Sequence, residues 1–308
     1  MTLDDRIKND LEERLEGKPI KSAVDLQPLL ACSTKVNAFS TMGMPGYFTG
    51  NRDAETVFVQ LNPGLDATEA DIRWDFETKH FRKESFVDDY KDSRKKYGKN
   101  DRMREDSFDF KQAAFLYDWK DSGINFLPNV DWNNKNDKTI HLWLDSKEQV
   151  LMDKLQLELV PYASSKFDIN KEHLDLLFPF VDTLLEEIFR PQEGRKYVIF
   201  GGDFDDLFKL YNEKKNKTIF EDLTRKENVF EINGTQMSEN EKRARGFVIK
   251  KDNNVLSSAL NYKVIRIHFD GKQQKALIAY TYPKKDLTNA FRIMQAYGKF
   301  CYEAYNKL

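Results

Sequence analysis

The chain has 308 residues, of which 40% are apolar and 32% charged, with 23 phenylalanines, 13 tyrosines and a formal net charge of −2. This composition excludes intrinsic disorder, which requires few aromatic residues and a high net charge, and the length suffices for one large folded core. It also excludes an overall positive field, so a nucleic-acid partner must be bound by a local group of lysines and arginines.

The cysteine content and the hydropathy of the chain limit the compartments and the kinds of site that it can have. Cys32 and Cys301 are the only cysteines, which excludes zinc knuckles and iron–sulfur sites and indicates a reducing compartment. No apolar run reaches the roughly 18 residues of a membrane span, and the acidic N-terminus is not followed by a signal-type apolar segment. We expect a cytoplasmic monomer without metal, cofactor or membrane contact.

The first predicted elements are helical. Leucine and isoleucine recur in steps of four over residues 2–16, which predicts a helix with Thr2 as its N-cap and Gly17 at its end. A second helix is predicted over residues 22–36. A glycine-rich loop over residues 43–51 follows.

The next segments predict one strand and one insertion. A β-rich run over residues 56–61 ends sharply at Asn62-Pro63-Gly64. Residues 66–110 are charged and low in aliphatic side chains, which predicts an insertion with helical stretches. We find no linker that would divide the chain, and we therefore expect a single domain over residues 1–308.

Apolar runs and helical segments then alternate. Strand-like runs occur at residues 155–161, 197–200 and 277–281, and residues 173–189 have helical periodicity. Buried strands separated by helices predict a three-layer α/β/α fold with a mainly parallel, four-stranded central sheet. An extra hairpin is predicted from three further strand-like segments with turns between them, residues 229–232, 246–249 and 263–268.

Ligands of such sheets bind beyond the carboxyl ends of the strands. Three of the four predicted strands end in loops with unusual side chains, which are residues 62–65, 161–165 and 282–287. Taken alone, Asn62-Pro63-Gly64 is also an ordinary turn, because proline fixes φ and glycine permits a positive φ. The order of the three loops favours a shared site.

Residues 57–65, Val-Phe-Val-Gln-Leu-Asn-Pro-Gly-Leu, resemble the first motif of the uracil-DNA glycosylase superfamily, in the Asn-Pro-Gly form of its mismatch-specific and single-strand-selective branches. The resemblance covers roughly residues 43–65 and 150–308. It implies the family's α/β fold and its activity, which is hydrolysis of the bond between deoxyribose and a base flipped out of DNA. The further similar segments are residues 45–51, before the motif strand; 157–161, at the base-reading strand; 277–287, at the His-Pro loop; and 288–308, at the closing helix.

The resemblance implies roles for individual residues. Asn62 would orient the attacking water through its side-chain carbonyl, and Gly64 would lie beside the base. The family histidine corresponds to Tyr282 or is absent, and loss of one preorganised donor costs on the order of 10²–10³ in rate in other enzymes. The sequence therefore predicts a slow or differently assisted reaction.

Glu158 stands where the family carries a base-reading asparagine. An amide both donates and accepts, whereas an ionised carboxylate only accepts, which suits an exocyclic amine such as that of cytosine and repels the O4 atom of uracil. If Glu158 lines the pocket, the substrate is a cytosine-type or otherwise modified base. If the side chain lies on the other face of its strand, it is a structural residue in a salt bridge.

Further candidates surround the expected pocket. Aromatic rings at Tyr47, Phe48 and Tyr162 can stack on a flipped base or belong to the core. Beyond the last strand, Lys284 and Lys285 are candidates for phosphate contacts, and Leu287 for a wedge in the vacated base stack.

Two functions remain open from the sequence. One is a DNA glycosylase that acts on a non-canonical base in single- or double-stranded DNA, in repair or in defence against modified bases. The other is a catalytically inactive relative that binds nucleic acid or a nucleotide.

Overall fold

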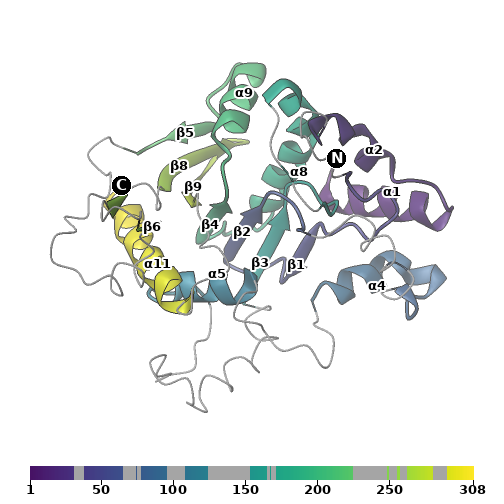
Figure 1. The fold of residues 1–308 in the computed structure, drawn as a ribbon, viewed down its shortest axis with the longest axis horizontal. Helices are drawn as coiled ribbons and strands as arrows, with labels where there is room; N and C mark the ends of the chain where they lie inside the picture. The colour runs from purple at the N-terminus through teal and green to yellow at the C-terminus, as the bar shows by residue number, and fades with distance from the viewer. Residues whose placement is uncertain are drawn as a thin grey trace, which may run out of the picture.

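A mixed sheet of seven strands forms the centre of the structure, with helices on both faces (Figure 1). The computed structural model describes residues 1–30, 38–64, 74, 78–95, 108–123, 153–164, 167, 171–224, 248–249, 255–256, 262–279 and 290–308. The fold is therefore α/β, as the sequence predicts, but the sheet is larger than the expected four strands.

Neighbouring strands of the sheet run in both directions. Strand β2 pairs in parallel with β3 and with β4, and β4 pairs in parallel with β9, whereas β1, β8 and β5 are joined by antiparallel pairs. The order across the sheet is β1 (Phe48–Gly50), β3 (Lys154–Glu158), β2 (Thr56–Gln60), β4 (Tyr197–Gly201), β9 (Lys272–Ala279), β8 (Tyr262–Phe269) and β5 (Phe220–Asp222).

The extra strands explain the difference from the expected sheet. Residues 263–268 were expected in a separate hairpin, but β8 pairs along its whole length with β9 and so widens the main sheet. Strand β1 comes from the glycine-rich loop and pairs with β3. A separate two-stranded sheet consists of β6 (Val248–Ile249) and β7 (Val255–Leu256). Residues 229–232 lie outside the described residues.

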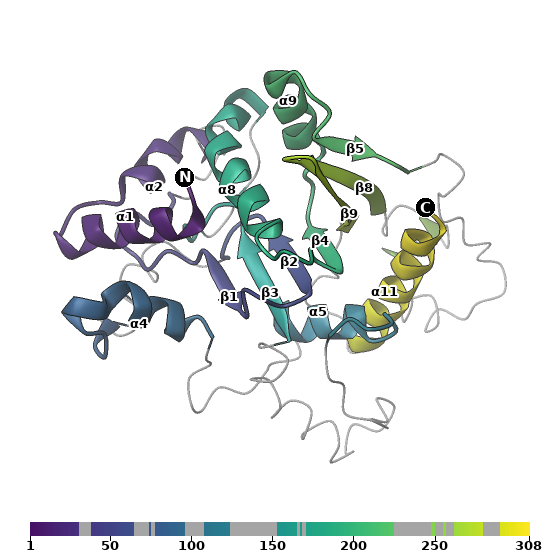
Figure 2. The same ribbon diagram turned by 180° about the vertical axis from the view of Figure 1, so that it is seen from behind.

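One face of the sheet packs against most of the helices. Strand side chains such as Val57, Leu157 and Phe200 point into this core. Figure 2 shows α1, α8 and α9 along this side. The elements of this layer are α1 (Leu3–Leu15), α2 (Lys21–Asp25), η1 (Gln27–Leu30), η2 (Lys83–Ser85), α4 (Phe86–Ser93), η3 (Lys171–Leu177), α8 (Phe178–Ile188) and α9 (Asp205–Lys215).

The other face is covered by α5 (Phe108–Leu116) and α11 (Ala290–Lys307), which pack on a second core. Phe58, Ile199 and Leu277 point into it from β2, β4 and β9. Because side chains alternate along a strand, odd and even residues of β2 serve different cores. Strands β2 and β4 are consequently buried along their full length.

The helix predictions have mixed outcomes. The first helix is confirmed, with Thr2 accepting from the Asp5 amide in a capping box. The second is shorter than expected, because α2 ends at Asp25 and a 3₁₀ turn that contains Pro28 follows. Part of the predicted insertion belongs to the main fold, since Tyr90 of α4 is fully buried in the α8-side core.

The amino edge of the parallel strands is held by ionic contacts. Glu187, at the end of α8, is 4% exposed and lies between Arg52, Arg190 and Arg195, which precede β2 and β4. Such a group is costly to bury unless its charges are paired, as they are here. Among the described helices, none is both long enough and apolar enough to cross a membrane.

Candidate functional site

The loops after β2 and β3 run side by side beyond the carboxyl edge of the sheet. The Val160 amide donates to the Leu61 carbonyl at 2.9 Å, and Gly64 forms a parallel bridge with Ser164. The glycine-rich loop before β1 closes on them, because the Gly46 amide donates to the Pro161 carbonyl at 2.6 Å. A Cβ atom at Gly46 would lie 3.0 Å from the Pro63 side chain, so a larger residue here would need Pro63 to shift slightly.

The Asn62 side chain is anchored through its amide nitrogen. Nδ2 donates to the Ser164 hydroxyl at 2.8 Å and to the carbonyls of Pro63 and Tyr162 at 3.1 and 3.3 Å. Carbonyl oxygens only accept, so these contacts fix which end of the amide carries the nitrogen. No described residue donates to Oδ1 of Asn62. The amide therefore presents an oriented acceptor to a water or a ligand.

Alternation along the strands assigns side chains of the loop to the two faces. Leu61 packs against the α8-side core, which directs the adjacent Asn62 away from that core. Glu158, in register with Gln60, shares its face with Gln156, which receives a hydrogen bond of 2.9 Å from Gln112 of α5. Alternation thus assigns the side chains of Asn62 and Glu158 to the α5 side of the sheet, while Glu158 also borders the small cavity between α1 and α8 on the other face.

Glu158 has one partnered and one unpartnered oxygen. Gln156 donates to Oε1 at 2.7 Å, whereas Oε2 is buried without a hydrogen-bond partner in the described part of the chain. Burial raises the pKa of Glu158 to about 8, against smaller lowering effects of the Gln156 hydrogen bond and the charge of Lys154. At neutral pH the group is mainly a neutral acid, which can donate from one oxygen. The ionised carboxylate assumed from the sequence prevails only above about pH 8.

The three aromatic candidates lie in the α8-side core. Tyr47, Phe48 and Tyr162 are 1–2% exposed, so none presents a ring face to a base in this conformation. Both phenols donate to Oδ2 of Asp10 at 2.7 Å, and Phe48 packs edge-on against Tyr90. Tyr162 nevertheless contacts the site, because its backbone carbonyl accepts from Asn62.

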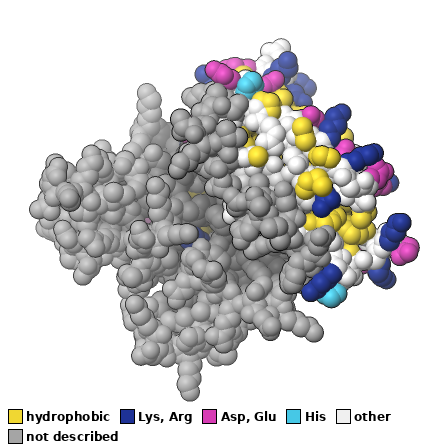
Figure 3. Space-filling model, turned by 45° about the vertical axis from the view of Figure 1, so that its right-hand side comes forward, with side chains coloured by type: hydrophobic (Ala, Val, Ile, Leu, Met, Phe, Trp, Pro, Cys, Tyr) yellow, Lys and Arg dark blue, Asp and Glu magenta, His cyan; other side chains and the backbone are white. Residues whose placement is uncertain are grey.

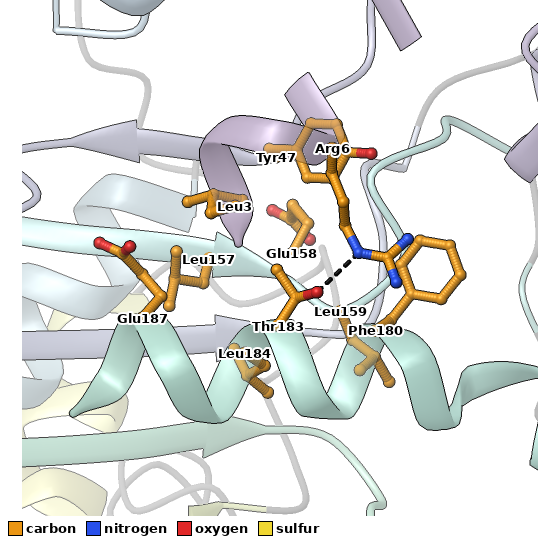
Figure 4. A pocket seen from close by; sticks show the side chains of 10 residues that line it. All are labelled: Leu3, Arg6, Tyr47, Leu157, Glu158, Leu159, Phe180, Thr183, Leu184 and Glu187. Atoms are coloured by element: carbon orange, nitrogen blue, oxygen red, sulfur yellow. Dashed lines mark hydrogen bonds between the residues drawn. The ribbon is translucent and has the colours of Figure 1, made fainter. Parts of the chain in front are cut away.

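A small cavity separates α1 and α8 on the Tyr47 side (Figure 4). Its volume is about 20 Å³, which admits one water and no base. Arg6 crosses it and donates to the Thr183 hydroxyl at 2.6 Å. A base pocket on this side would require the tyrosines to move.

Tyr282, Lys284, Lys285 and Leu287 lie outside the described residues, as does the expected approach of Tyr282 to Asn62. Figure 3 shows part of the surface on one side, where lysine and arginine side chains are interspersed with acidic and apolar ones. Within the described residues, no group of three or more histidine, cysteine or acidic side chains is arranged to hold a metal ion.

Several residues of the site were not found by sequence reasoning. Asp10 carried a usable signal, since it lies among Leu3, Ile7 and Leu11 on the apolar side of a predicted helix, where a carboxylate is costly. Gln112 and Gln156 carried none, because an isolated glutamine is typical of a solvated surface.

Comparison of the chain with protein-family models, with curated proteins and with solved structures found no match.

Proposed function

We propose that the chain is a DNA glycosylase-like protein of the uracil-DNA glycosylase superfamily that hydrolyses the N-glycosidic bond of a flipped, non-canonical base. The observation that carries the proposal is the anchored Asn62 amide, whose oxygen is left as an acceptor beyond a central, fully buried strand. In this proposal β3, β2, β4 and β9 correspond to the family's parallel strands, and the remaining strands are additions.

The proposed reaction follows from what an amide can do. Asn62 Oδ1 accepts a hydrogen bond from water and so orients the oxygen lone pair toward the sugar carbon. An amide is a poor base, so the water loses its proton only after the bond to the base has begun to break and positive charge has developed on the sugar; its oxygen bonds to the sugar carbon, and the proton passes through solvent to the departing base. Negative charge then builds on the departing base, and a donor close to it lowers the barrier.

Glu158 supplies the proposed base contact. With Oε1 occupied by Gln156, only Oε2 remains for a ligand, and a base would reach this buried atom after a local rearrangement of the loops. A protonated Oε2 donates to a keto oxygen such as O4 of uracil, whereas an ionised Oε2 accepts from an exocyclic amine. Since burial raises the pKa of Glu158 to about 8, the proposed preference is for keto-bearing bases at neutral pH and for amine-bearing bases in alkali. This revises the cytosine-type substrate that an always-ionised Glu158 implied.

Abasic-site formation tests the proposal. Single- and double-stranded oligonucleotides that carry uracil, hypoxanthine or modified cytosines are incubated with the protein and cleaved in alkali, with Asn62→Ala as the control. We expect cleavage of at least one substrate by the wild type only. If the protein binds these oligonucleotides but cleaves none of them, the inactive nucleic-acid-binding module is the better hypothesis. If it neither binds nor cleaves any of them, both hypotheses are wrong.

A further inference from the structure

We propose that Asp10 is a positioning residue, whose carboxylate ties Tyr47 and Tyr162 together and thereby fixes the two loops that hold Asn62. The structural part of this inference stands on contacts within the chain. Its meaning for catalysis rests on the proposed function. We call Asp10, Tyr47 and Tyr162 the carboxylate clamp.

The clamp joins three separate segments at one oxygen atom. Asp10 lies on α1, Tyr47 just before β1, and Tyr162 in the loop after β3. Both phenol hydroxyls donate to Oδ2 of Asp10 at 2.7 Å, and the two hydroxyl oxygens are 3.4 Å apart. All three side chains are at most 2% exposed, so water does not compete for these contacts.

A short path leads from the clamp to the Asn62 amide. The Tyr162 carbonyl is one of the three acceptors of Asn62 Nδ2, and Ser164, two residues further, supplies another. The Tyr47 side of the clamp holds the same loop, because the neighbouring Gly46 amide donates to the Pro161 carbonyl. Loss of the clamp would release both loops and with them the orientation of the amide.

The ionised carboxylate is costly at this position. Burial raises the pKa of Asp10 to about 6, although the hydrogen bonds from Tyr162 and Tyr47 act in the opposite direction. The positive charge of Arg6 lowers the pKa of Asp10 by a smaller amount, and its guanidinium donates to Thr183 and to the Pro179 carbonyl and lies 4.4 Å from the ring centre of Phe180.

The remaining charges around Asp10 border a surface groove between α1 and α2. They belong to Glu12, Glu13 and Glu16 of the α1 end and to Lys21 of α2, with the Ser22 hydroxyl beside them. Glu13 raises the pKa of Asp10 further. A charged acceptor is kept here despite its cost, and charge-assisted hydrogen bonds are about twice as strong as neutral ones.

Hydrogen exchange of three loop amides tests the clamp without any substrate. The amides of Ser40, Gly46 and Ser164 donate to Ala163, Pro161 and Pro63, and the Ile199 amide of β4 serves as an internal reference. In Asp10→Ala we expect the loop amides to exchange at least tenfold faster and the reference to be unchanged. Asp10→Asn, whose oxygen can accept from both phenols, should restore protection at pH 7.5. Glu12→Ala, on the exposed rim of the groove, should match the wild type.

Acidification and a milder variant complete the test. From pH 7 to 5 the wild-type loop protection, corrected for intrinsic exchange, should rise, because opening the clamp returns the Asp10 carboxyl to its lower, solvated pKa, whereas Asp10→Asn should show no such step. Should Asp10→Ala not fold, Tyr162→Phe removes one phenol hydroxyl and should weaken protection at Ser164 and Gly46. Unchanged loop exchange in both Asp10→Ala and Tyr162→Phe would overturn the proposal.

The catalytic arm separates this inference from the proposed function. With an oligonucleotide that the wild type cleaves, Asp10→Ala should lower kcat at least tenfold with less change in KM, and Asp10→Asn should recover most of it. If the wild type cleaves no substrate but the variants show the expected exchange pattern, the proposed function is contradicted and the clamp proposal is supported. An Asp10→Ala variant with wild-type activity and normal exchange would contradict the clamp proposal and leave the proposed function standing.

Discussion

Three acids, the buried Asp10 and Glu187 and the partly buried Glu158, are stabilised in three different ways. Glu187 is surrounded by arginines, Asp10 accepts from two phenols, and Glu158 receives one amide hydrogen bond. An unpaired charge is costly in such surroundings, and the donors around each carboxylate offset that cost to different degrees. Burial raises the pKa values of Asp10 and Glu158, and the hydrogen bonds that each receives offset this effect only in part.

Glu158→Gln is predicted to remove the pH dependence of base choice. With Gln156 donating to the side-chain oxygen, the new amide nitrogen occupies the place of Oε2 and donates at every pH. Affinity for a keto base should stay constant from pH 6 to 9.5, whereas in the wild type it should fall about tenfold or more above pH 8. Binding titrations with uracil- and cytosine-containing oligonucleotides over this pH range check the prediction. If affinity depends on pH in the same way in the wild type and in Glu158→Gln, Glu158 is a structural residue.

Asp10→Asn is predicted to be at least as stable as the wild type at pH 8. The pKa of Asp10 rises from 3.8 to about 6 on folding, so the unfolded state loses its proton first and the wild type loses stability as pH rises through this window. The penalty is complete above pH 6 and is about 3 kcal/mol by the linkage relation. Urea unfolding should show a difference that shrinks toward pH 4, and a less stable Asp10→Asn at pH 8 would contradict the assigned cost.

At the level of elements, α5 and α11 cross in close contact. A Cβ atom at Gly298 would lie 1.7 Å from the Phe115 carbonyl oxygen, and the Gly298 carbonyl accepts from the Trp119 indole at 2.8 Å. The two helices therefore touch through their backbones, and α5 in turn carries Gln112 to the Glu158 side of the sheet.

Gly298→Ala is predicted to destabilise the protein by about 3 kcal/mol, at the upper end of overpacking effects, because the helices must separate. Chemical unfolding measures this directly. Lys299→Ala, one residue along and exposed, is the matched control and should change stability by less than about 0.5 kcal/mol. A tolerated Gly298→Ala would show that α11 can shift without cost.

Sequence reasoning found the elements that are buried on both faces and missed those that are short. The strand around Phe58 is an apolar run because both of its faces contact a core. The buried side of the first helix is visible in the sequence as apolar residues in steps of four. Strands β1 and β5 have three residues each, too few for a pattern. Strand β9 begins with polar residues, Lys272 to Lys275, whose place in the sheet is set by pairing with β8.

The position of Asn62 beyond β2 was predictable from the motif, whereas the surroundings of the other candidate residues depend on packing. The burial of Tyr47 and Tyr162 depends on α1, which is distant in sequence and carries Asp10 to them. The raised pKa of Glu158 likewise depends on tertiary burial, which no local pattern reports.

For the whole molecule, a net charge of −2 limits the expected affinity for DNA. We predict a footprint of about three to five phosphates and a slope of about −3 to −5 in a plot of log affinity against log salt. Replacing Lys284 and Lys285 by alanine should reduce the slope by about two, whereas Lys8→Ala, on the exposed side of α1, should leave it unchanged. Binding that does not respond to salt would exclude phosphate contacts as its source.

Release of a free base is the most direct measurement of the central claim. Oligonucleotides with the base panel are incubated with wild type or Asn62→Ala, and the small-molecule fraction is identified by mass spectrometry. We predict one intact free base per abasic site from the wild type and at least a hundredfold slower release from Asn62→Ala, on the order of losing one preorganised group. Absence of free base from every substrate, or equal release by Asn62→Ala, would contradict the account.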